Sequence, residues 1–185
     1  RMSAWADADQ PRVKWGRYGT KHRSEPAEVA LMVSTPTKSP NGDIEWRTEY
    51  QRLHRVGGPA VIRADGSESW WEDGGLHRIG GPAVDRPDGP KEWWVNGERH
   101  RDDGPAYTEP DGTEAWWSNG VLHRTDGPAA NWPDGRLQWW ENGELHRVDG
   151  PAVIRPDGYE AWIIHDRYHR LDGPARTLAD GTLEW

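Results

Sequence analysis

Hydrophobic positions along this chain form short runs, and each run ends at a turn signal. Runs rich in Trp, Val, Ile and Leu, which are good strand formers, alternate with Asn-Gly and Asp-Gly steps. Gly or Pro recurs every few residues, which excludes long helices. Asn-Gly and Asp-Gly favour two-residue hairpin loops because both central residues must adopt positive φ. The pattern therefore predicts an all-β chain of short hairpins.

The whole pattern repeats with a period of 23 residues. Each unit reads Leu-His-Arg-x-Asp-Gly-Pro-Ala, then an Asp-Gly step, then Trp-Trp-x-Asn-Gly. The His of the His-Arg step is His54, His77, His100, His123, His146 and His169. The first Trp of the pair is Trp70, Trp93, Trp116, Trp139, Trp162 and Trp185. This periodicity predicts an elongated solenoid of about seven stacked antiparallel β-hairpins, forming a single-layer twisted sheet.

The repeats extend over nearly the entire chain. We expect residues 53–185 to form six regular repeats, the last of them incomplete. Residues 1–52 are expected to form a degenerate N-terminal repeat or cap of the same solenoid, since Gly19–Ala27 and Pro40-Asn41-Gly42 match parts of the unit. The sequence places Arg1 before Met2 and stops at Trp185, midway through a unit. This favours a fragment of a longer protein.

The Asn-Gly loops allow a prediction of strand register. If Asn142-Gly143 is a two-residue loop, Trp140 lies opposite Leu145 and Trp139 lies opposite His146. Successive side chains point to opposite faces, so one face carries the first Trp with His and the other carries the second Trp with Leu. The equivalent second-Trp pairs are Trp71/Leu76, Trp94/Arg99, Trp117/Leu122 and Ile163/Tyr168.

The Asp-Gly steps leave two loop lengths open. A two-residue loop pairs Arg63 with Glu68, which is favourable, but it also places Glu109 opposite Glu114. A three-residue loop with a bulge is the alternative, and the Pro that precedes most of these steps favours it.

The unit resembles a known repeat family. The spacing Trp-x-Asn-Gly-x-x-His, seen from Trp140 to His146 and as Trp-Glu-Asp-Gly from Trp71 to His77, is similar to that of the MORN repeat. The resemblance implies β-hairpins stacked into an elongated twisted sheet. The chain departs from the family where Arg follows the His, where the Tyr and Gly before the Trp are missing, and where the Asp-Gly step is displaced by two residues.

Composition limits the classes of partner. The chain has 14 Trp and no Phe or Cys, which excludes disulfides and thiolate metal sites. The net charge of −8 opposes binding to nucleic acid or anionic lipid. A signal peptide and a transmembrane segment are absent from the sequence, which together with the lack of Cys favours a cytoplasmic location. We expect no cofactor.

The His-Arg-x-Asp string carries residue types used in catalysis and metal binding. An active site needs one set of groups in one place, whereas six copies along a solenoid indicate a framework role. Equivalent histidines of neighbouring units lie on the order of 10 Å apart, too far to share a zinc ion. We therefore expect no enzyme activity and no metal site. The predicted framework residues are the histidines His54, His77, His100, His123, His146 and His169 and the tryptophans Trp70, Trp93, Trp116, Trp139 and Trp162.

The second Trp column varies from unit to unit, as a face that meets a particular ligand can. Residues that break the repeat are further candidates, because sites on regular scaffolds often lie at irregular positions. The predicted binding residues are Trp71, Trp94, Arg99, Trp117, Trp140 and Tyr168, with Tyr107, Trp132 and His165. The leading hypothesis is a non-catalytic scaffold that binds a protein or peptide along an extended surface. The alternative is glycan or cell-wall binding through a Trp ladder.

Overall fold

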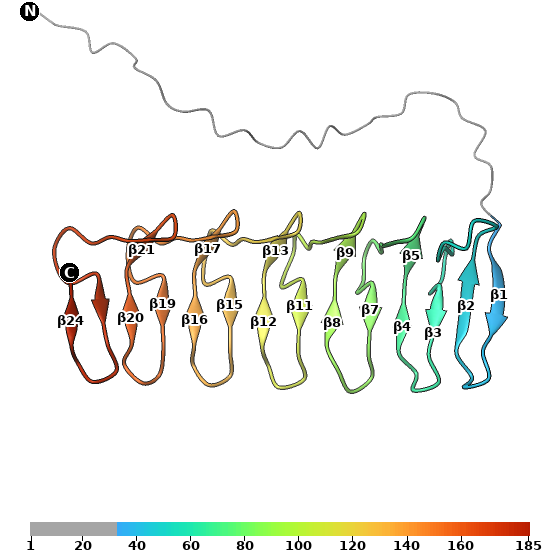
Figure 1. Ribbon diagram of the computed structural model, residues 1–185, viewed down its shortest axis with the longest axis horizontal. Coiled ribbons are helices and arrows are strands. Elements are labelled where there is room, and N and C mark those ends of the chain that lie inside the picture. Colours follow the sequence, from blue (N-terminus) through green and yellow to red (C-terminus); the bar gives the residue numbers. More distant parts are fainter. Residues whose placement is uncertain (1–32) are drawn as a thin grey trace, which may run out of the picture. The chain divides into compact units, whose positions relative to one another are not determined.

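The computed structural model describes residues 33–185, and this part of the chain is all-β. The segment Gly19–Ala27, matched above to the repeat, lies outside the described residues. Fourteen strands form one antiparallel sheet of hairpins, which confirms the predicted stack of β-hairpins. The sheet is not closed into a barrel. Successive hairpins lie side by side in chain order (Figure 1).

The large sheet consists of one hairpin from each unit. Its strands are β1 (Thr35–Lys38), β2 (Ile44–Arg47), β3 (Val61–Ile62), β4 (Glu68–Ser69), β7 (Val84–Asp85), β8 (Lys91–Glu92), β11 (Tyr107–Thr108), β12 (Glu114–Ala115), β15 (Ala130–Asn131), β16 (Leu137–Gln138), β19 (Val153–Ile154), β20 (Glu160–Ala161), β23 (Arg176–Thr177) and β24 (Leu183–Glu184). No helix in the described range is long and apolar enough to cross a membrane.

A second hairpin in five of the units lies outside this sheet. These two-stranded ladders pair β5 (Trp71–Glu72) with β6 (Gly75–Leu76), β9 (Trp94–Val95) with β10 (Glu98–Arg99), β13 (Trp117–Ser118) with β14 (Val121–Leu122), β17 (Trp140–Glu141) with β18 (Glu144–Leu145), and β21 (Ile163–Ile164) with β22 (Arg167–Tyr168). They form a row along one end of the large sheet (Figure 1). The sequence had predicted one sheet and did not anticipate this division.

The chain passes from the sheet to the small hairpin at the first Trp. The N–H of Trp139 donates to the C=O of Ala152 in the neighbouring unit, at 2.8 Å. The C=O of the same residue accepts the N–H of His146 across the small hairpin, at 3.1 Å. One residue thus belongs to both ladders. The division follows because its two backbone groups point to different partners.

The small hairpins have the predicted register. Trp140 pairs with Leu145, Trp94 with Arg99, and Ile163 with Tyr168. Asn142 has φ of 52° and Gly143 has φ of 84°, as expected for a type I′ turn in which both central residues have positive φ. In the last unit His165 and Asp166 occupy these two positions, with φ of 48° and 60°. The turn geometry therefore persists where its Asn-Gly sequence is lost.

The Asp-Gly turns use the three-residue loop. In the β3–β4 hairpin Ile62 pairs with Glu68, and the N–H of Arg63 donates to the C=O of Ser67 at 2.8 Å. Gly66 N–H donates to Arg63 C=O, and Gly66 has φ of 84°, so a type I turn is followed by a glycine bulge. The Asp65 carboxylate accepts the N–H of Ser67 at 2.8 Å, which fixes the loop.

The core is narrow and is built mainly from small residues. The Ala of each Pro-Ala step between residues 33 and 185 is buried, and several of these side chains have no exposed surface. These alanines are Ala60, Ala83, Ala106, Ala129, Ala152 and Ala175. The large side chains of the paired tryptophans are half-buried around them. Apolar surface is therefore removed from water mainly by stacking between units.

Candidate functional site

Between residues 33 and 185 the Arg of each His-Arg step covers the first Trp of the preceding Trp pair, or Trp46 at the N-terminal end. In the described chain six guanidinium carbons lie 3.7 to 4.3 Å from the centroid of the Trp ring beneath, within range of a cation–π interaction. Arg124, for example, lies 4.0 Å above Trp116. The sequence had assigned the partner of the first Trp to His. The backbones of Trp139 and His146 are indeed bonded at 3.1 Å, and the Arg over the Trp ring is a second partner that the sequence had not indicated.

The rest of the loop holds this Arg in place. Nη1 of Arg124 donates to the C=O of Pro128 at 3.2 Å, and Nε donates to the Asp126 carboxylate at 2.7 Å. A Cβ added at Gly127 would lie only 3.0 Å from the Arg124 Cζ atom, so any larger residue there would push the guanidinium from its place over the backbone. The Arg-x-Asp-Gly-Pro sequence is thus a clamp for one side chain.

The histidines connect successive small hairpins. Nδ1 of His123 accepts the backbone N–H of Asn142, the first residue of the next small turn, at 3.1 Å. His54, His77 and His100 accept the equivalent N–H at 3.1 Å. Nδ1 of His146 is buried without a hydrogen-bond partner, and its ring lies 4.3 Å from that of His165. These contacts agree with a framework role for the histidines, which stays a prediction.

The second Trp column packs against the sheet. The indole N–H of Trp71 donates to the Ser69 hydroxyl at 2.7 Å. Those of Trp94 and Trp140 donate to the side chains of Glu92 and Gln138, both at 3.1 Å. In each case the acceptor lies two residues earlier, on the same face of the sheet strand. The column predicted as a binding surface is therefore half-buried between the small hairpins and the sheet.

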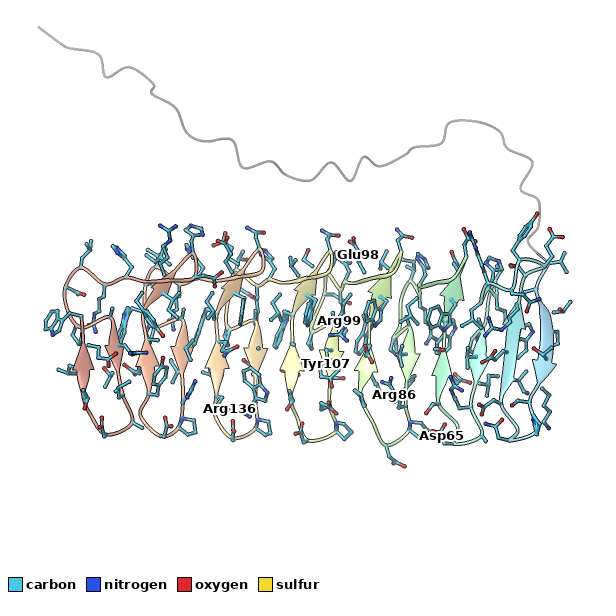
Figure 2. The ribbon with its side chains drawn as sticks, in the orientation of Figure 1. Asp65, Arg86, Glu98, Arg99, Tyr107 and Arg136 are labelled. Atoms are coloured by element: carbon cyan, nitrogen blue, oxygen red, sulfur yellow. The ribbon has the colours of Figure 1, made fainter. Side chains whose placement is uncertain are left out.

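Arg99 and three other predicted binding residues form one cluster. Its guanidinium carbon lies 4.9 Å from the Trp94 centroid, 5.1 Å from that of Tyr107 and 5.0 Å from that of Trp117. Figure 2 shows Arg99 and Tyr107 next to each other in the middle of the molecule. Nη2 of Arg99 also forms an ion pair with Oε2 of Glu92 at 2.6 Å, and Glu92 is only 8% exposed.

The Glu92 carboxylate in this cluster is paired with Arg86 and Arg99, while Nε of Arg99 is buried without a hydrogen-bond partner. Burial raises the pKa of Glu92, but the hydrogen bonds from Arg86 and Arg99 outweigh it, so the pKa lies below its ordinary value. Burial and the hydrogen bond with Glu109 raise the pKa of Tyr107 to about 12. Both groups therefore hold their ordinary charge at neutral pH. The cluster resembles a polar core more closely than a reactive centre.

The remaining predicted binding residues are dispersed. Trp132 lies at the Asp-Gly end of its hairpin beneath Arg136, which is 4.9 Å from its centroid. Tyr168 is exposed and neighbours Arg176, at 5.1 Å. His165 is at a small-hairpin turn, where Nδ1 lies 2.8 Å from the Glu144 carboxylate. The structure does not bring these three to the Arg99 cluster.

Three hollows recur on the side of the first Trp column. Each lies between two successive His-Arg-x-x-Gly loops and has a first-column Trp among its lining residues: Trp93, Trp116 or Trp139. We call them the loop hollows. Their volumes are about 360, 680 and 640 Å³ in chain order. Because the loops repeat, the same combination of Trp, Arg and His side chains lines each one.

Acidic side chains stand at the rim of these hollows. Asp103, Asp126 and Asp149 each pair with the Arg two residues earlier, at 2.7 to 3.0 Å, and this hydrogen bond holds their carboxyl pKa below its ordinary value. Asp172 makes the same pair with Arg170. The carboxylates are exposed, whereas the guanidinium groups lie against Trp rings.

The loop hollows can be described by the chemistry of their lining. Among residues 33–185 no three His, Cys, Asp or Glu side chains lie close enough together to hold a metal ion. The loop hollows combine aromatic floors with anionic rims, which suits polar or cationic groups.

Sequence reasoning missed two groups of residues. The Arg of the His-Arg step was considered only as part of the His-Arg-x-Asp motif. Its constant spacing of eight residues from the preceding first Trp could have indicated that the two side chains stack. The polar residue two positions before the second Trp was also missed. It is Ser69, Glu92 or Gln138 before three of the second-column tryptophans, and each accepts the indole N–H. It is Ala115 before Trp117, whose indole N–H has no partner, and Ala161 before Ile163.

Comparison with known proteins identifies no family for this chain. The chain matches none of the protein-family models, and no curated protein matches it. The resemblance to the MORN repeat therefore stays a prediction that depends on the Trp-x-Asn-Gly-x-x-His spacing alone.

Proposed function

We propose that this chain is a non-catalytic, MORN-like repeat scaffold that binds a protein or peptide partner along an extended surface. The observation that carries the proposal is the recurrence of the loop hollows, which have equivalent linings in successive units. A partner that fills one hollow can continue into the next, and stacked repeats create binding surfaces of this kind. Chemical steps need one converging set of groups, which a periodic surface does not supply.

The choice of surface follows from what each Trp column contacts. The second column is occupied by its own contacts with the sheet, as for Trp71 with Ser69 and Trp94 with Glu92. The loops on the first-column side expose apolar side chains at the position after the Arg, among them Val148 and Leu171. Exposed apolar groups beside hollows are typical of interaction surfaces. We therefore place the partner on the first-column side.

An array of unrelated peptides tests this function. The full chain, labelled with a fluorophore, is incubated with immobilised peptides of increasing length. We expect affinity to rise with length, because each added stretch of about three extended residues spans a further unit of roughly 10 Å. Affinity that is the same for three residues as for twelve contradicts an extended surface. Failure to bind any peptide or folded protein overturns the proposal.

Glycan binding is the second candidate, and one hollow favours it. A cavity of about 240 Å³ lies on the sheet side of the second column and is lined by Trp71 with Ser67, Ser69 and other polar groups. An aromatic ring beside hydroxyl and charged groups suits a single sugar ring. Retention of the chain on insoluble polysaccharide, lost in Trp71→Ala but kept in Trp116→Ala, supports this alternative over the peptide scaffold.

A further inference from the structure

The four loops 101–104, 124–127, 147–150 and 170–173 present a regular row of carboxylates, and we call them the acidic loops. Their anions are Asp103, Asp126, Asp149 and Asp172, one in each unit. Consecutive strands in a sheet are about 4.8 Å apart and each unit contributes two strands to the large sheet, so the row repeats about every 10 Å.

In each acidic loop the negative charge is exposed to solvent and the positive charge is mostly covered. The carboxylate side chains of the acidic loops are 80 to 86% exposed, while the paired guanidinium side chains are only 23 to 26% exposed. The cation is turned inward over its Trp, and the anion is turned outward. Asp102, which is 93% exposed, adds another carboxylate at the first acidic loop. The outward face of the row is therefore negative although every loop also contains an Arg.

The period of the row matches that of an extended peptide. Three residues of a β-strand span about 10 Å, and three residues of a polyproline II helix span about 9.3 Å. A polyproline II helix has three residues per turn, so its side chains three residues apart lie on one side and can face successive acidic loops, whereas those of a β-strand point to opposite faces. Across all four loops the mismatch for polyproline II accumulates to only about 1 to 2 Å, within the reach of a long side chain.

We propose that the acidic loops bind an extended peptide that carries a cationic side chain at every third position. Each Lys or Arg of the peptide pairs with one outward carboxylate, and those at Asp103, Asp126 and Asp149 enter an adjoining loop hollow next to its Trp. The two intervening residues pass over the side chains that follow the Arg, such as Thr125, Val148 and Leu171. This inference rests on the proposed scaffold function and names the chemistry of its partner.

The other loops of the described chain mark where this site ends. At the positions equivalent to Asp103, two earlier loops have Gly57 and Gly80, with Arg55 and Arg78 over their Trp rings as elsewhere. The stacking framework continues there but the outward carboxylate does not. Binding of cations is thus assigned to the four acidic loops, and the peptide needs about twelve residues to cover them.

Two synthetic peptides test the spacing on the full chain. One contains Arg-Pro-Pro four times and the other contains Arg-Pro-Pro-Pro four times, so that both carry four cations on a polyproline II backbone. We expect at least a tenfold lower Kd for the period of three, because the period of four drifts by about 3 Å at each loop. Equal affinities for the two peptides overturn the proposal.

Two matched quadruple variants test the position. In the first, Asp103, Asp126, Asp149 and Asp172 are changed to Asn, which keeps an acceptor oxygen for each Arg. In the second, Asp111, Asp134, Asp157 and Asp180 of the Asp-Gly turns are changed to Asn, which removes the same charge at the opposite end of the hairpins. Asp65, the equivalent turn residue of an earlier unit, marks this end in Figure 2. Circular dichroism confirms that each variant is folded.

The first variant is expected to lose at least tenfold in affinity for the period-of-three peptide, and the second to lose less than threefold. Equal losses overturn the proposal, because net charge alone then explains binding. If peptides bind the chain on an array but the acidic-loop variant binds them as well as the parent, the inference fails and the scaffold function stands. If no peptide of any spacing binds, the inference fails, and if no folded protein binds either, the scaffold function fails with it.

Discussion

A single hydroxyl should stabilise the fourth unit of the sheet. The indole N–H of Trp117 is buried without a hydrogen-bond partner, because Ala115 occupies the position that carries an acceptor in other units. Ser69 fills the equivalent strand position and accepts the N–H of Trp71 at 2.7 Å. Ala115→Ser should therefore place an acceptor within reach of Trp117.

The expected gain follows from the cost of a buried unpaired donor. A typical intramolecular hydrogen bond contributes about 0.5 to 1.5 kcal/mol to stability, which corresponds to roughly 1 to 6 °C in Tm for a chain of this size. Conversely, Ser69→Ala leaves the indole N–H of Trp71 unpaired and should cost about 1 to 3 kcal/mol. One substitution adds a hydrogen-bond acceptor and the other removes one, so their changes in the free energy of unfolding should have opposite signs.

Denaturant unfolding followed by Trp fluorescence and by circular dichroism measures both changes, and a constant slope shows that compactness is unaltered. The control is Ala115→Ser in a Trp117→Leu background, where the hydroxyl has no indole to accept from and should bring no gain. A double-mutant cycle then isolates the hydrogen bond. The reasoning is refuted if Ala115→Ser does not stabilise the parent, or if it stabilises the Trp117→Leu background equally.

Three further predictions concern the loops and the buried ion pair. Gly127→Ala should destabilise the chain by about 1 to 3 kcal/mol, because the added Cβ displaces the Arg124 guanidinium from Trp116; an unchanged denaturation midpoint would contradict this. His123→Ala should cost about 1 to 3 kcal/mol, since it leaves the N–H of Asn142 without its acceptor. His146→Ala should cost less in the same unfolding assay, because its Nδ1 has no partner to lose. Glu92→Gln should be less stable than the parent at pH 7. The pKa of Glu92 is lower in the folded chain than its ordinary value of 4.5, so its contribution is complete above that pH and is lost as the pH falls through the lower value. Unfolding midpoints from pH 7 to pH 3 should therefore converge for parent and variant, and a constant difference would show that the charge of Glu92 is unimportant.

Local turn chemistry could be predicted from the residues alone. Asn142 and Gly143 have the positive φ that a type I′ turn requires, and the pairing of Trp140 with Leu145 follows directly from that loop length. The same reasoning extends to Ile163 and Tyr168, although His165 and Asp166 have replaced the Asn-Gly step. Asn-Gly identifies this turn locally, and the constant loop length of the repeat extends the same conformation to His165-Asp166.

The Asp-Gly turns mark the limit of local reasoning. Both a two-residue and a three-residue loop fitted the residues around Asp65, and side-chain pairing favoured neither. The structure has the longer loop, in which Asp65 caps the N–H of Ser67 and Gly66 forms the bulge. The choice depends on how the flanking strands join their neighbours, since β3 also pairs with β2 and β4 with β7.

The candidate site was predicted only in part for a similar reason. The residues of the second Trp column were identified, but their contact with the sheet was not, because it requires the small hairpins to leave that sheet at the first Trp. The Arg that covers Trp116 comes from eight residues further on, and the His that accepts the N–H of Asn142 comes from 19 residues earlier. Such contacts depend on the path of the chain between the partners.

Sequence by itself thus determined the repeat, the hairpins and the register of their tightest turns, because each of these depends on residues that are close in the chain. Tertiary structure decided which ladder each hairpin joins, which side of each Trp is covered and where charge faces outward. Trp139 illustrates the reason: its N–H is paired with Ala152 of the next unit while its C=O is paired with His146 of its own hairpin. No local preference selects between those partners, and only the stacking of whole units does.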